Sequence, residues 1–166
     1  MMASTHVLFG LNCWLGYAQL RGLPLHPEAI LIAGAAALLP DIDHPKSTFG
    51  SMVPFLSRPI SAIFGHRGIT HSLFAILAGI FIMHRYGYQT EYVAAIVVGY
   101  LSHLAGDMLT NSGVPLLWPV KSKIAIPVFS TGGFVEWLVR IALTGLLCWI
   151  VVWPWLAKTG VLKSYF

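Results

Sequence analysis

Residues 92–109 have the sequence YVAAIVVGYLSHLAGDML, an apolar stretch that approaches the roughly 20 residues needed to cross the hydrocarbon core of a bilayer. The stretch contains His103 and Asp107, whose spacing places them one turn apart on the same face of a helix. Ionisable side chains inside an apolar helix are costly and usually face a cavity or a partner. The sequence therefore predicts an apolar helix with a polar site on one face. The alternative is a hydrogen bond between His103 and Asp107 that helps to hold two helices together.

The composition of the chain indicates a helical integral membrane protein of a single domain, residues 1–166. The residues AVILMFWYC make up 57% of the 166 residues and DEKR make up 10%, whereas a typical soluble domain has about 25% charged residues. So few charges cannot cover a surface that faces water, and a mean hydropathy of +0.75 excludes a disordered chain. The net charge of +4 comes from scattered Lys and Arg, so we expect loops that face the lipid bilayer and no nucleic acid partner.

Five apolar stretches separated by polar segments predict an all-α fold with five main helices. The stretches are residues 7–20, 29–39, 69–83, 92–109 and 137–157. The first three fall short of a full span, so we expect the second to be extended, enclosed by its neighbours or re-entrant. The N-terminus has no basic start and no small-x-small cleavage site, which predicts a retained helix rather than a signal peptide.

Residues 50–66, GSMVPFLSRPISAIFGH, carry large apolar side chains three and four positions apart. This spacing favours a short interfacial helix that lies on the membrane surface. An irregular loop is the alternative for a segment that contains Pro54 and Pro59.

The few ionisable side chains gather at one end of the predicted bundle. If the five stretches alternate in direction, one end collects four of the six acidic residues and five of the seven histidines. They are Asp41, Asp43, Asp107, Glu136, His6, His44, His66, His71 and His103. Imidazoles and carboxylates without thiolates are suitable ligands for Zn²⁺, with Mn²⁺ or Fe²⁺ as alternatives. The clustering therefore predicts a divalent metal site.

In residues 38–45, LLPDIDHP, we expect Asp41 and Asp43 to project to the same side of an extended turn, followed by His44. Two carboxylates this close repel each other unless a cation or a proton lies between them. A capping or turn aspartate is the alternative, but it explains only one of the two.

In residues 64–73, FGHRGITHSL, Gly68 allows a sharp turn that brings His66 and His71 together. A plain surface histidine is the alternative for His66.

Glu136 lies at the start of the fifth helix. An ion pair with Arg140 accounts for an acidic residue at this position as well as metal ligation does.

So many ligands exceed one tetrahedral site, and we expect two metal ions, with three as the alternative. Such ions lower the pKa of a bound water and clamp the oxygens of a displaced ester. Arg67 would hold an anionic phosphate, with Lys46 or Arg58 as weaker candidates. We therefore predict metal-assisted hydrolysis of a lipid or membrane-proximal phosphoester, with catalytic roles for Asp43, His44 and Arg67.

Three blocks of sequence, after an N-terminal THVLFG, together resemble the YdjM-like family of bacterial inner-membrane proteins. The blocks are LLPDIDHPKSTFG (38–50), FGHRGITHSL (64–73) and GYLSHLAGDMLTNSGVPLLWP (99–119). Members of this family are described, from such motifs, as membrane-bound metal-dependent hydrolases. The resemblance spans residues 4–140 and implies a multi-pass inner-membrane protein with a hydrolase-like domain.

A more distant likeness is to zinc-dependent phospholipase C and the fungal single-strand nucleases, which are all-helical and bind three metal ions. Their ligand order resembles His6, Asp41 or Asp43, His71, His103 with Asp107, and Glu136. Those enzymes have further histidines before the late glutamate, and this chain has none after His103. The likeness therefore implies two ions more readily than three.

A transport protein with a relay of ions or protons along the same His and Asp residues is the main alternative function. The clustering at one end counts against it, because a relay needs polar residues along a path. A structural membrane adaptor predicts no clustering. Five Lys and Arg residues at the ligand end against four at the other favour the cytoplasmic side for the site.

Overall fold

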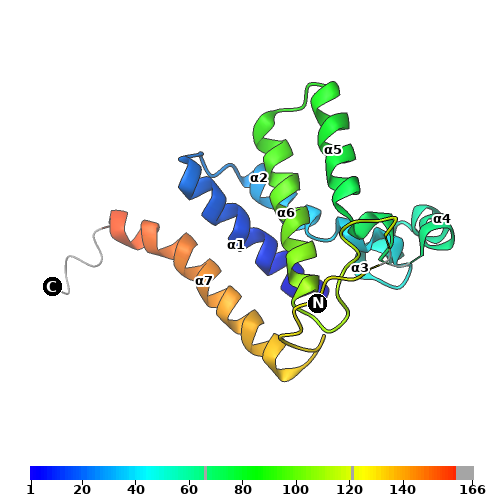
Figure 1. Ribbon diagram of the computed structural model, residues 1–166. Helices are drawn as coiled ribbons and strands as arrows, with labels where there is room; N and C mark the ends of the chain where they lie inside the picture. The colour runs from blue at the N-terminus through cyan, green and yellow to red at the C-terminus, as the bar shows by residue number, and fades with distance from the viewer. Residues whose placement is uncertain (66, 121, 160–166) are drawn as a thin grey trace.

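The computed structural model describes residues 1–65, 67–120 and 122–159, which form a bundle of helices (Figure 1). Within these ranges there are seven α-helices and two short 3₁₀ helices, and the only extended pairings are two isolated bridges. The elements are α1 (Ala3–Arg21), α2 (Pro27–Ala36), η1 (Leu39–Asp43), α3 (Thr48–Met52), α4 (Pro54–Phe64), η2 (Ile69–His71), α5 (Leu73–Arg85), α6 (Thr90–Met108) and α7 (Phe134–Thr159). The all-α prediction is confirmed.

The five apolar stretches correspond to α1, α2, α5, α6 and α7, and these helices alternate in direction along the chain (Figure 1). Two of the boundaries that differ from the prediction lie next to predicted ligands. The second helix ends at Ala36, and the chain then winds more tightly into η1, which contains Pro40. The third begins only at Leu73, because the extended backbone of Ser72 separates α5 from η2.

Helix α6 is central and packs against α1, α2 and α5. The buried core shared by α1, α2 and α6 consists of Trp14, Ala18, Ala29, Ala33 and Ala95. Small residues let the helices approach closely, as is common in membrane bundles. At Gly99, for example, a Cβ would lie 2.2 Å from the carbonyl oxygen of Ala33. This contact holds the end of α2, and η1 beyond it, against the C-terminal half of α6.

In the described part of the chain, α7 alone has a segment long and apolar enough to cross a membrane, Phe134–Pro154. Helix α6 has 19 residues, but Glu91, His103 and Asp107 reduce its mean hydropathy. The expectation that both of the last two stretches suit a span therefore holds for α7 only. Helices α2 and α5 are apolar but short, as the sequence indicates.

The predicted interfacial segment is helical and divided into α3 and α4. Pro54 lies in the first turn of α4, where its missing N–H costs no intrahelical hydrogen bond. The helix exposes large apolar side chains, including Phe55 (79%) and Ile63 (72%). The irregular-loop alternative is therefore wrong, and the exposed apolar side chains suit an interfacial position.

Candidate metal centre

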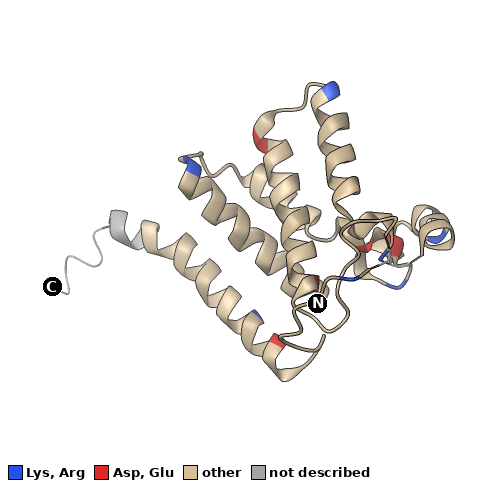
Figure 2. Ribbon diagram, viewed as in Figure 1, with Lys and Arg blue, Asp and Glu red and all other residues tan. Residues whose placement is uncertain are grey.

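Four elements bring ionisable side chains to one place. The first turn of α1 contributes His6, η1 contributes Asp41, η2 contributes His71, and the last turns of α6 contribute His103 and Asp107. Figure 2 shows acidic residues in red at the end of α6 beside the N-terminus and next to α3. Two groups of potential ligands form, one of Asp41, His71 and His103 and one of His6, His103 and Asp107, and they share His103. The structure thus contains a buried His and Asp cluster that is compatible with a metal site.

His71 and His103 face the same two carboxylates. His71 Nε2 lies 3.7 Å from Asp41 Oδ1 and 3.9 Å from Asp107 Oδ2. His103 Nε2 lies 3.8 Å and 3.9 Å from the same two oxygens. Ligand atoms around tetrahedral zinc are roughly 3.3 Å apart, so each imidazole nitrogen would need to approach these carboxylate oxygens by about half an ångström.

The orientation of His103 leaves a buried lone pair in the middle of the cluster. Its Nδ1 lies 2.7 Å from the carbonyl oxygen of Ala37. Because a carbonyl oxygen only accepts, Nδ1 carries the proton and Nε2 keeps its lone pair. Among the described residues, His103 Nε2 has no hydrogen-bond partner. Metal-ligating histidines have this arrangement, with one ring nitrogen donating to a carbonyl and the other available for the ion.

His6 and Asp107 extend the cluster toward α1. The imidazole of His6 stacks on that of His103, with 3.7 Å between ring centroids and 11° between the planes. His6 Nε2 lies 3.2 Å from Asp107 Oδ1, which also accepts from the nitrogen of Met1. The other oxygen of Asp107 faces His71 and His103. Asp107 therefore links the two groups of potential ligands.

Arg67 balances the negative charge of the cluster. Its Nη2 lies 2.6 Å from Asp107 Oδ2, and its Nη1 donates to the carbonyl of Gly113 at 3.0 Å. Its backbone lies in the left-handed region, with φ of 59°. The guanidinium already pairs with Asp107, so a phosphate held by Arg67 would have to share that cation.

Asp43 lies behind the cluster and supports His71. Its Oδ2 accepts hydrogen bonds from the amide of Arg67 (2.8 Å) and the hydroxyl of Thr70, and it lies 3.3 Å from His71 Nδ1. Asp41 faces the other nitrogen of the same ring. The extended turn predicted for the two aspartates is wrong. The tighter winding of the 3₁₀ helix η1 directs the carboxylates to opposite nitrogens of one imidazole.

Three predicted His and acidic site residues, Asp43, His44 and Glu136, belong to neither group of potential ligands within the described ranges. His44 is the half-buried residue that directly follows η1. Glu136 is buried, and its carboxylate accepts hydrogen bonds from the amides of Met2 (2.7 Å) and Gly132 (2.6 Å). These bonds anchor the start of α7 to the N-terminus. His66 lies outside the described residues.

Three supporting groups were not predicted from the sequence. They are the Thr70 hydroxyl, the Ala37 carbonyl and the Tyr100 hydroxyl, which donates to the carbonyl of Thr70. Tyr100 lies three residues before His103, so helical periodicity already placed it on the same face. The role of a backbone carbonyl, by contrast, has no signature in a sequence.

Comparison with known proteins identifies relatives along nearly the whole chain. A family model described as YdjM inner membrane protein matches residues 1–164. Inner membrane protein YdjM of Escherichia coli (strain K12) is 40% identical over 142 residues, which cover 77% of this chain and 70% of that protein. The Shigella flexneri protein of that name gives the same values. Uncharacterized protein YvsG of Bacillus subtilis (strain 168) is 36% identical over 151 residues, covering 90% of this chain and 93% of that protein. No solved structure matches this chain.

Proposed function

We propose that this chain, which belongs to the YdjM inner membrane protein family, is a membrane-bound hydrolase that uses divalent metal to cleave a phosphoester. By family and by the names of its relatives it is an inner membrane protein. The ligands in this proposal are His6, Asp41, His71, His103 and Asp107. Zn²⁺ suits their chemistry best, in two sites that would share the carboxylate of Asp107, with the single lone pair of His103 available to one of them.

The observation that supports this proposal most strongly is the environment of His103 Nε2. It is a buried nitrogen with a lone pair, no hydrogen-bond partner in the described chain, and two carboxylate oxygens within 3.9 Å. Leaving such an acceptor unsatisfied costs about 1–3 kcal/mol, which a ligated cation would offset.

The residues around the cluster have distinct tasks in this proposal. A bound divalent ion would supply Lewis acidity toward a phosphoryl oxygen and lower the pKa of water. Asp43 holds the ring of His71 through Nδ1, and the Ala37 carbonyl does the same for His103. Arg67, whose side chain is 14% exposed, adds a positive charge that draws an anionic ester toward the cluster.

Metal analysis of the full-length protein purified in detergent tests the proposal. We expect stoichiometric zinc, manganese or iron in the wild type. The variant H103Q keeps a polar side chain of similar size and should lose most of the metal, because both groups of ligands use His103. The matched control is H84Q, in the last turn of α5 at the opposite end of that helix from His71, and it should retain the metal.

Two further measurements separate a metal site from a hydrolase. Adding Zn²⁺ to stripped protein should raise the Tm of the wild type and of H84Q but not of H103Q. A panel of phosphoesters then measures hydrolysis by the metal-loaded protein. Equal metal content in H103Q and H84Q would contradict the metal site. Bound metal without hydrolysis of any phosphoester would contradict the proposed reaction.

A further inference from the structure

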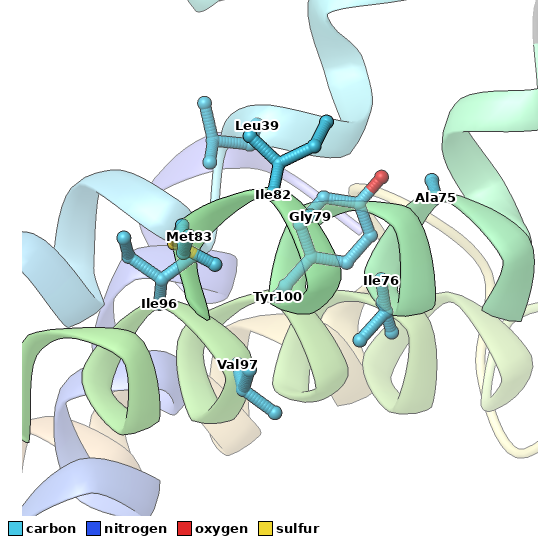
Figure 3. A pocket seen from close by; sticks show the side chains of 9 residues that line it. All are labelled: Leu39, Ala75, Ile76, Gly79, Ile82, Met83, Ile96, Val97 and Tyr100. Carbon is cyan, nitrogen blue, oxygen red and sulfur yellow. The ribbon is translucent and has the colours of Figure 1, made fainter. Parts of the chain in front are cut away.

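An apolar cavity of about 270 Å³ lies between α5 and α6 (Figure 3). Its α5 wall includes Ala75, Gly79 and Met83, which recur every four residues on one face of the helix. Tyr100 of α6 and Leu39 of η1 contribute to the other walls. None of the nine lining residues carries a charge.

The cavity shares its walls with the elements that hold the candidate ligands. Leu39 begins η1, two residues before Asp41. Tyr100 lies one turn before His103 on α6. Helix α5 starts two residues after His71, so its first cavity residues follow the ligand by about one helical turn. An occupant of the cavity would therefore end close to the metal centre.

The lining suits a hydrocarbon chain and no polar polymer. Its one hydroxyl, on Tyr100, already donates to the carbonyl of Thr70. A peptide backbone or a sugar would leave its own polar groups unpaired there, which is costly. Gly79 leaves room in the wall, because a Cβ at this position would meet only the terminal methyl of Met83, at 3.9 Å. From Ala75 to Met83 the lining extends for roughly 12 Å along the helix, enough to follow an extended chain.

We infer that this cavity holds an acyl chain of the substrate, and that the anionic phosphoester headgroup of the same lipid lies at the metal centre. The inference rests on the proposed function and narrows its substrate class to membrane lipids with an acyl chain and a phosphate ester. The bilayer supplies such molecules directly to a cavity between two helices of an inner membrane protein.

Photo-crosslinking tests occupancy without requiring hydrolysis. The full-length protein is reconstituted in vesicles of phosphatidylethanolamine and phosphatidylglycerol that contain a small fraction of phosphatidic acid with a diazirine on one acyl chain. Mass spectrometry should find the adducts concentrated on the cavity residues, Met83 and Tyr100 among them. Adducts no denser there than on the exposed face of α7 would overturn the inference, because the cavity would then contact lipid no differently from any exposed apolar surface.

The variant G79L fills the cavity, and G16L is its matched control because a Cβ at Gly16 meets nothing within 4 Å. Cavity adducts should fall about tenfold or more in G79L, because the leucine side chain takes the space that the labelled chain would occupy, and should be unchanged in G16L. If G79L does not fold, A75L narrows the same cavity from the preceding turn. Equal adducts in the filled variant and in G16L would overturn the inference.

An activity comparison separates this inference from the proposed function. Hydrolysis of long-chain phosphatidic acid should fall in G79L, whereas hydrolysis of glycerol phosphate, which has no acyl chain, should not. Cavity adducts without hydrolysis of either compound would support the acyl site and contradict the hydrolase. Hydrolysis that depends on His103 but is the same in G79L and the wild type would contradict the acyl site alone.

Discussion

The two ends of α6 each carry a carboxylate beside a histidine, in very different surroundings. In the first turn, Glu91 lies 4.0 Å from His26, whose side chain is 51% exposed. In the last turns, Asp107 is 1% exposed and faces three imidazoles. Water screens the first pair, which contributes about 0–1 kcal/mol to stability, whereas a buried carboxylate persists only with partners. Burial and convergence from several elements distinguish the candidate site, since the residue types are the same at both ends.

The largest expected effect is that of Asp107→Ala, which removes the buried carboxylate at the C-terminal end of α6. Arg67 would lose its buried counter-charge, and His6 would lose the carboxylate oxygen that lies 3.2 Å from its Nε2. We expect the free energy of unfolding in mixed micelles to fall by about 3–5 kcal/mol, with loss of bound metal. A decrease below about 1 kcal/mol would indicate that Asp107 behaves like an exposed carboxylate.

Gly99→Ala tests whether the buried end of α6 depends on its close packing against α2. The added Cβ would lie 2.2 Å from the Ala33 carbonyl, so α2 must move away from α6. A loss of about 1–3 kcal/mol is expected, with weaker metal binding because the carbonyl of Ala37 would shift relative to His103. Gly145→Ala is the control, since a Cβ there meets nothing within 4 Å. Thermal unfolding and metal content of both variants give the comparison, and equal losses would contradict it.

Asp43→Asn sharpens the distinction between ligands and their supports. It removes the charge that faces His71 Nδ1 but leaves all five proposed ligands in place. Metal affinity should fall by about 10–100-fold, measured by competition with a chelator. An unchanged affinity would mean that the ring of His71 is held by other contacts, and a complete loss would make Asp43 itself a ligand.

Glu91→Gln alters the exposed end and should have the smallest effect. We expect the free energy of unfolding to change by less than about 0.5 kcal/mol and the metal content to stay the same. Metal loss from this variant would show that the two ends of α6 are coupled.

The gathering of ligands at one end was predictable because it depends only on alternating apolar stretches, and His103 and Asp107 meet as their spacing requires. The separate positions of Asp41 and Asp43 were not predictable. The sequence LPDID is compatible with an extended turn and with a 3₁₀ helix, and packing against α3, α4, η2 and α6 selects the helix. The Ala37 carbonyl could not be predicted either, because it depends on where α2 stops.

Arg67 contacts two carboxylates of the site. Its backbone amide donates to Asp43, and its guanidinium pairs with Asp107. Its left-handed backbone costs about 1–2 kcal/mol for a residue with a side chain, and glycine would adopt the same φ of 59° freely. Glycine would remove this strain, but it would also leave the buried Asp107 carboxylate without the guanidinium, which costs about 3–5 kcal/mol. The ion pair therefore outweighs the strained backbone, so arginine at this position stabilises the folded chain while it balances the charge of the cluster.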